Sequence, residues 1–168
     1  MSNTQDHCQQ ARELFPNMNE ELFTLWLDGR IRVLGWPPHG SRWDGIFWNK
    51  PISFWQNLKW EKKELKLTFQ MVGPKSQKII YNLMRGIGGQ PNALTSFIGN
   101  SGKRAISIYR YLKETGKLPN SIILFSNDSL LEVADGFHRL TVLFMLQEDI
   151  DEATTMSETQ SAWLGSMQ

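Results

Sequence analysis

Apolar and polar residues alternate most clearly just before the middle of the chain. Leu65, Leu67, Phe69 and Met71 alternate with Lys66, Thr68 and Gln70, which gives one apolar and one polar face and predicts a strand over 64–72. Gly73-Pro74 interrupts this pattern. The helical spacing that follows predicts a helix over 75–85 that ends at Gly86, with an inner face of Ile79, Ile80, Leu83 and Met84.

The other elements are predicted from shorter signals. Near the start, a short helix is expected around 9–15, and Asn19 is placed to cap a helix over 20–28 that Gly29 can end. A short strand over 30–34, a turn-rich loop over 35–45 and an aromatic core segment over 46–60 are expected next. Later elements are helices over 92–98 and 103–115, strands over 121–125 and 130–134, and a helix over 136–147.

These elements predict an α/β (α+β) fold in which helices flank a mixed sheet. We expect one compact domain over 18–150, preceded by a polar N-terminal segment (1–17) and followed by an acidic, flexible tail (151–168). The 168 residues are 40% hydrophobic, which is enough apolar material for a core.

Composition excludes several classes of protein. No run approaches the roughly 20 apolar residues that span a bilayer, and the first ten residues lack the features of a secretory signal, so a cytoplasmic protein without membrane insertion is expected. Cys8 is the single cysteine, which excludes an intramolecular disulfide and a multi-cysteine zinc site. Because Cys8 lies in the polar N-terminal segment, replacing it with serine is expected to leave activity intact.

Positive charge is concentrated in one segment. Residues 59–113 hold eleven basic and two acidic residues, although the net charge of the whole chain is only +1. Such a block suits a face that binds a polyanion, and the absence of a base-reading module predicts sequence-independent DNA binding that weakens steeply with salt. It equally suits helix surfaces solvated by lysine, or a surface covered by the acidic tail. The candidate nucleic-acid-binding residues are Lys59, Lys62, Lys63, Lys66, Lys75, Lys78 and Arg85.

Two glycine-rich loops are similar to phosphate-binding motifs, but each lacks a residue that the motif requires. The loop that ends at Gly102-Lys103 has Phe97 where a P-loop needs its first glycine, and the loop around Gly86 and Gly88 lacks the third glycine of a dinucleotide fingerprint. A weaker possibility is an anion site at a glycine turn that opens the helix over 103–115, with Lys103 and Arg104 as cations. Two ordinary helix caps would explain the same residues.

The most informative motif is Asp-Gly-Phe-His-Arg at 135–139, between a strand and an apolar helix. Backbone N–H groups and the helix dipole favour an anion there, so cations in the first turn work against helix stability. Arg139 offers a forked donor for phosphate, His138 can transfer a proton near neutral pH, and Asp135 can orient His138, cap the helix or bind a divalent metal. The alternative is an Asp cap followed by a surface His-Arg pair. The hydrophobic residues Leu140, Leu143, Phe144 and Leu146 are expected to anchor the helix without these polar groups.

This strand, turn, strand and motif resemble the ParB/sulfiredoxin superfamily, whose members carry Asp-Gly-His-His-Arg, Gly-Gly-Cys-His-Arg or related forms here. The similarity covers roughly 118–147. It implies a small α/β fold that binds a nucleotide phosphate or a phosphodiester at this helix N-terminus, through Asp135, Gly136, His138 and Arg139.

Differences between this sequence and the superfamily's motifs exclude some of the superfamily's functions for this chain. Position 137 is Phe, which removes the attacking cysteine of sulfiredoxins, and too few residues follow Gln147 for the helix-turn-helix domain of partition proteins. Asp44 and Glu132 are the nearest candidates for the extra catalytic glutamate of the superfamily's free-serine kinases. Stand-alone members act in plasmid and phage biology as nucleases, ATPases or inhibitors of conjugative DNA transfer, including plasmid fertility-inhibition proteins of the Osa type.

The resulting hypothesis is a phosphate-ester hydrolase, an ATPase, a DNase or both. His138, Arg139 and Asp135 would carry the chemistry, ATP or another nucleotide would bind, and Mg²⁺ is a possible cofactor that Asp135 would hold. Two alternatives stay open: a non-catalytic inhibitor of a type IV secretion, coupling or DNA-processing protein, and a small-molecule kinase. The sequence does not indicate an oligomeric state.

Overall fold

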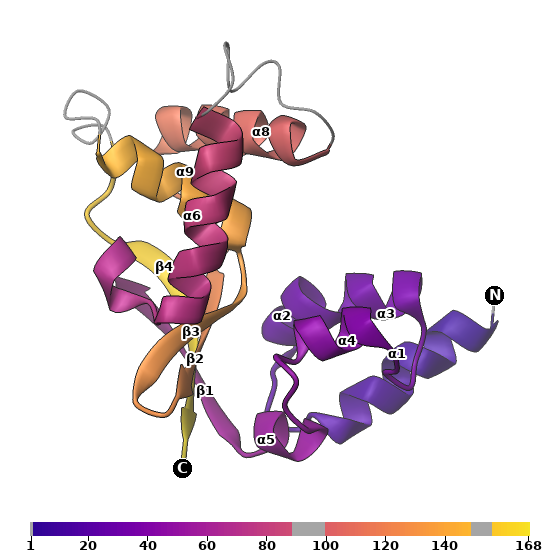
Figure 1. Cartoon of the computed structure of the whole chain (residues 1–168). Coiled ribbons are helices and arrows are strands. Elements are labelled where there is room, and N and C mark those ends of the chain that lie inside the picture. The colour runs from indigo at the N-terminus through magenta and orange to yellow at the C-terminus, as the bar shows by residue number, and fades with distance from the viewer. Residues whose placement is uncertain (1, 89–99, 149–155) are drawn as a thin grey trace. The chain divides into compact units, whose positions relative to one another are not determined.

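The computed structural model describes residues 2–88, 100–148 and 156–168, and its elements are labelled in Figure 1. Helices and a four-stranded sheet make up the described part, which confirms the predicted α/β class. The predicted helix over 92–98 and most of the predicted tail before 156 lie outside the described residues. No helix of the described ranges is both long and apolar enough to cross a membrane.

The chain divides into two compact units instead of one domain over 18–150. The first unit comprises residues 1–61 and 163–168, and the second comprises residues 62–162. Both boundaries fall within strands, β1 (Leu58–Leu65) and β4 (Gln160–Met167).

Helices form nearly all of the first unit. They are α1 (Ser2–Leu14), α2 (Glu20–Phe23), a π-helical turn (Thr24–Asp28), α3 (Gly29–Leu34), α4 (Ser41–Ile46) and α5 (Ile52–Gln56). The Asn19 side chain accepts a hydrogen bond from the Leu22 N–H at 2.9 Å, so the predicted cap is confirmed. The strand predicted over 30–34 is wrong. Gly29 keeps helical dihedrals, and the helical path ends at Gly35, where φ is +80°.

Aromatic rings form the core of this unit, as expected for 46–60. The rings of Trp26 and Trp55 lie 4.9 Å apart, and the Trp55 indole N–H donates to the Phe47 carbonyl at 3.2 Å. The predicted polar N-terminal segment also contributes, because Cys8 and Ala11 on α1 are buried. Burial, then the neighbouring Asp28 carboxylate, raise the pKa of the Cys8 thiol. Cys8 is therefore an inert core residue and not part of a mobile segment, although its irrelevance to activity stays a prediction.

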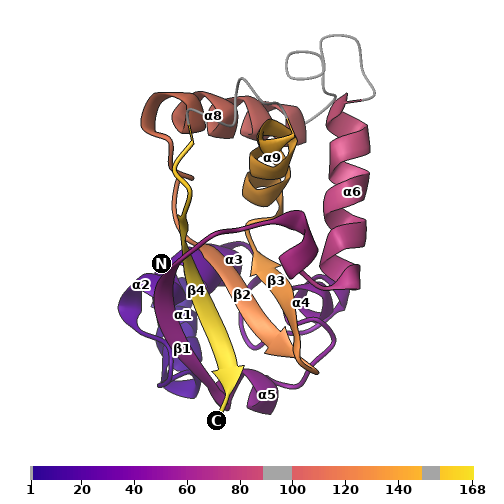
Figure 2. The same cartoon turned by 90° about the vertical axis from the view of Figure 1, so that its left-hand side faces the viewer.

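The sheet has the strand order β1-β4-β2-β3 (Figure 2). Strands β2 (Ile122–Asn127) and β3 (Leu130–Asp135) form an antiparallel hairpin, with Leu124 opposite Val133. Asp128 and Ser129 both have positive φ at its turn, as a tight two-residue hairpin requires. The two strands predicted here are confirmed. The flexible tail predicted over 151–168 is wrong for 160–167, because β4 lies between β1 and β2 and buries Ala162.

The strand predicted over 64–72 is also wrong. Strand β1 ends at Leu65, and the chain then forms a 3₁₀ turn over Phe69–Met71 before a single bridge joins Val72 to Leu131. The sequence does not reveal the true position of this strand, because β1 is an edge strand whose polar residues alternate only weakly with apolar ones. Leu58 is its one fully buried residue.

Three helices of the second unit position the candidate site. They are α6 (Pro74–Gly88), α8 (Asn100–Thr115) and α9 (Phe137–Gln147), and both α6 and α8 pack against α9. The predicted helices over 75–85, 103–115 and 136–147 are thereby confirmed. The predicted end at Gly86 is wrong because α6 continues to Gly88, and Ile79, expected on the inner face, is 41% exposed. The glycine turn predicted before Lys103 is not confirmed, since α8 begins at Asn100 and Gly102 lies inside it.

A buried carboxylate fixes the start of α6. The Glu132 side chain, 2% exposed, accepts hydrogen bonds from the Ser76 N–H at 3.0 Å and the Ser76 hydroxyl at 2.5 Å. A Cβ at Gly73 would stand 2.6 Å from the Glu132 carboxyl carbon, so this position requires glycine. Glu132 thus caps a helix, which makes it a structural residue and a poor candidate for a kinase glutamate.

Candidate functional site

The Asp-Gly-Phe-His-Arg motif lies at the junction of β3 and α9, as its sequence context predicted. Strand β3 ends at Asp135, and Gly136 then turns the chain with a φ of +106°. A Cβ at Gly136 would stand 2.6 Å from Ile122 Cδ1, so both dihedral and space require glycine. Helix α9 follows at once and directs the positive end of its dipole to this turn.

Arg139 points inward instead of toward an incoming phosphate. Its Nη2 donates to Asp135 Oδ2 at 2.6 Å, while Nη1 donates to the carbonyls of Ser121 at 2.8 Å and Pro119 at 3.3 Å. Both charged side chains are mostly covered, at 13% and 18% exposure. Arg139 therefore ties α9 to the start of β2, and the geometry does not favour the phosphate-binding and catalytic role predicted for it.

The Asp135 carboxylate in turn accepts a hydrogen bond from Arg139. The described residues contain no group of three His, Cys, Asp or Glu side chains that could together hold a metal ion. One carboxylate oxygen of Asp135 is engaged by Arg139, and a Mg²⁺ ion bound to Asp135 through water stays a prediction. The negative charge of Asp135 also acts on the neighbouring His138.

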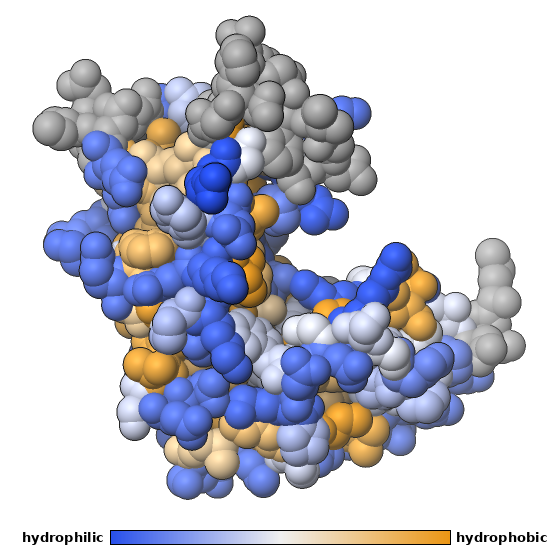
Figure 3. Space-filling view, in the orientation of Figure 1, coloured by the Kyte–Doolittle hydropathy of each residue, from blue (hydrophilic) through white to orange (hydrophobic). Residues whose placement is uncertain are grey.

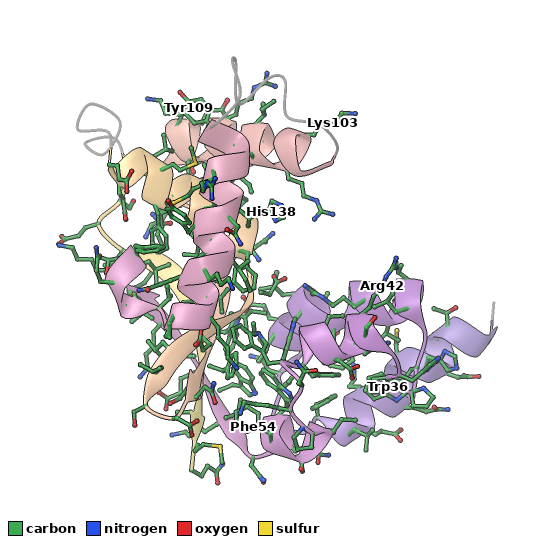
Figure 4. The ribbon with its side chains drawn as sticks, in the orientation of Figure 1. Trp36, Arg42, Phe54, Lys103, Tyr109 and His138 are labelled. Atoms are coloured by element: carbon green, nitrogen blue, oxygen red, sulfur yellow. The ribbon has the colours of Figure 1, made fainter. Side chains whose placement is uncertain are left out.

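His138 lies within electrostatic range of Arg104, a residue 34 positions earlier in the chain. The imidazole is half-buried at the start of α9, and it lies below α8 in the view of Figure 4. Burial lowers the pKa of His138 below its ordinary value of 6.5, the positive charge of Arg104 lowers it further, and Asp135 opposes both effects. His138 is therefore neutral at pH 7 and can accept a proton.

Two of the predicted phosphate-binding cations lie on α8. Arg104 and Lys103 are both exposed, and Lys103 projects from the helix surface in Figure 4. Only Arg104 among them acts electrostatically on His138. The N-terminus of α9 and a neutral imidazole lie together, and a guanidinium from a second helix acts electrostatically on that imidazole, which is a favourable environment for a phosphate group.

The predicted nucleic-acid-binding residues separate into two sets. Those on or beside β1 are interleaved with carboxylates: Lys59 pairs with Glu61 at 2.9 Å and Lys66 with Glu158 at 3.2 Å. Helix α6, whose outward face is predominantly hydrophilic in Figure 3, contains no acidic residue. Its exposed cations are Lys75, Lys78 and Arg85, whereas Lys62 and Lys63 extend from β1. None of these seven residues is among the charges that shift the pKa of His138, which are those of Arg104 and Asp135.

We predict that Arg104→Gln raises the pKa of His138, because it removes a positive charge that disfavours the imidazolium. The change would be followed by NMR titration of the imidazole resonances. Lys103→Gln is the matched control and should shift the pKa less. An unchanged His138 pKa in Arg104→Gln would show that the two side chains do not interact.

The depressed pKa of His138 also sets a pH dependence of stability. The unfolded chain takes up a proton near 6.5, before the folded protein does so. The free energy of unfolding should therefore be unaffected by His138 above that pH and should fall as the pH drops below it.

Sequence reasoning missed a groove of about 530 Å³ along α8, whose lining includes Lys103, Arg110, Tyr111 and Pro119. The helical spacing of its α8 residues was visible in the sequence. Only the fold, however, shows that this face of α8 is exposed and that Pro119 lines the groove beside it.

Models of known protein families, curated protein sequences and solved structures were all compared with this chain, and none matches.

Proposed function

We propose that this protein is a nucleotide- and nucleic-acid-binding phosphohydrolase whose reaction centre is the start of α9, with His138 and Arg104 as its functional side chains. The observation that carries this proposal is the electrostatic effect of Arg104 on the half-buried His138 at the start of α9. The helix dipole and the guanidinium attract a phosphate group, and the neutral imidazole beside them can move a proton. The resemblance of residues 135–139 to the ParB/sulfiredoxin motif supports the same assignment.

The proposed reaction requires little of the protein beyond positioning and one proton transfer. Water attacks phosphorus, the bond between phosphorus and the leaving-group oxygen breaks, and His138 accepts the proton that water gives up. Arg104 stabilises negative charge on the phosphate oxygens. Asp135 and Arg139 hold the turn that presents His138, which makes them positioning residues.

The test is to incubate the purified full chain with γ-labelled ATP and, separately, with supercoiled plasmid DNA, each with Mg²⁺ and with EDTA. We expect release of labelled phosphate, nicking of the plasmid, or both. A protein that binds neither substrate would contradict the proposal entirely. One that binds ATP or DNA without turnover would contradict the catalytic part and favour a non-catalytic inhibitor.

A further inference from the structure

The groove along α8 is lined by cations and an aromatic ring, which suits a polyanion that carries planar bases. Exposed Lys103 and Arg110 lie seven residues apart on α8, with Ser107 between them. Seven residues span about 10.5 Å along a helix axis, a spacing at which each cation can bind a different phosphate group. Two successive phosphates of a nucleic-acid strand fit this spacing better than one inorganic phosphate.

The same groove offers a stacking surface. Tyr111 is 44% exposed, and Pro119 lines the groove beside α8. An aromatic ring exposed next to cations is the combination by which proteins bind unpaired bases. Glu114, at the end of the groove, can accept a hydrogen bond from an exocyclic amino group.

Two of the charges on α8, those of Lys103 and Arg110, are also available to an external partner. Within the described ranges, no carboxylate forms an ion pair with Lys103 or Arg110, in contrast to Lys59 and Lys66 near β1. Glu114 is the only acidic residue of α8, against four basic ones. As far as the described residues are concerned, a polyanion therefore displaces no ion-pair partner from these two cations.

We infer that the α8 groove binds single-stranded nucleic acid, with phosphates on Lys103 and Arg110 and a base stacked on Tyr111. This inference deepens the proposed function, on which it rests, because Arg104 of the same helix would lead the strand toward His138. A duplex is a poorer occupant, since its bases are already stacked and its phosphates alone would reach the groove.

The experiment measures binding of a fluorescein-labelled 20-nucleotide oligo(dT) strand and of a 20-base-pair duplex by fluorescence anisotropy over a range of salt concentrations. We expect Tyr111→Ala to weaken single-strand binding about 5- to 140-fold and to leave duplex binding nearly unchanged. Lys103→Gln with Arg110→Gln should lower the salt dependence for the single strand by about 1.4 in log–log slope, the value for two lost phosphate contacts. Arg42→Gln with Lys50→Gln removes the same charge from the first unit and serves as the control.

Three outcomes would overturn the inference. The first is an equal loss of single-strand and duplex binding in Tyr111→Ala, and the second is unchanged binding in all the groove variants. The third is a loss of binding confined to Lys59→Gln with Lys66→Gln, which would place the strand on β1. ATP hydrolysis by each variant separates this inference from the proposed function. If single-strand binding depends on Tyr111 but the protein hydrolyses nothing, the groove is supported and the hydrolase is refuted. If the protein hydrolyses ATP and Tyr111→Ala binds the single strand as tightly as the parent, the hydrolase is supported and the groove is refuted.

Discussion

Replacing His138 with glutamine should lower the rate of phosphate-ester hydrolysis by about 10²- to 10⁴-fold, the usual contribution of a general base. Glutamine keeps the size and polarity of the side chain but cannot take up a proton. Substrate affinity should change far less than turnover, because the imidazole acts mainly in the transition state. The measurement is kcat and KM for ATP, or the single-turnover rate on plasmid DNA.

His39→Gln is the matched control for this variant. His39 is exposed in the first unit, so its loss should leave turnover unaltered. His138→Gln should also melt close to the parent, since α9 is anchored by buried Leu140, Leu143 and Phe144. A folded His138→Gln protein with full activity would show that the reaction centre lies elsewhere.

Replacing Arg139 with methionine should lower the free energy of unfolding by about 2–4 kcal/mol. This differs from the sequence-based expectation that apolar residues alone anchor the helix. The change leaves the mostly buried Asp135 carboxylate without its 2.6 Å partner and removes the donor that satisfies the Ser121 and Pro119 carbonyls. For a chain of this length the melting temperature should fall by roughly 4–16 °C.

Two comparisons separate this effect from the general loss of an arginine. Arg85→Met removes an exposed cation from α6 and should change stability by no more than about 0.5 kcal/mol. Adding Asp135→Asn to Arg139→Met should cost less than the sum of the two single changes, because the two side chains are in contact. Strict additivity would mean that the ion pair does not stabilise the turn.

The hairpin and the amphipathic helices could be predicted because their signals are local. Strands β2 and β3 are apolar runs joined by a two-residue turn, and α6 carries a regular apolar stripe. Strand β4 could not be predicted from its own residues. It is a strand because it lies between β1 and β2, which is a non-local cause.

The candidate site was predictable in its position but not in the direction of its side chains. The sequence placed His138 and Arg139 in the first turn of a helix, and the structure confirms that placement. Which of the two faces a ligand depends on what surrounds them. The carbonyls before β2 accept hydrogen bonds from the Arg139 guanidinium, and α8, distant in sequence, supplies the Arg104 charge that acts on His138. We therefore propose Arg104, a cation from another helix, for the role that the motif suggested for Arg139.

The central claim, that a phosphate group binds between the start of α9, His138 and Arg104, is tested most directly by NMR titration of the ¹⁵N-labelled protein with ATP and with inorganic phosphate. We predict saturable shifts of the Phe137 and His138 amides and a rise in the His138 pKa, because a bound anion stabilises the imidazolium. Arg104→Gln should lose most of this response and Arg85→Gln should keep it. Amides of Phe137 and His138 that stay unmoved at saturating ATP would contradict the claim.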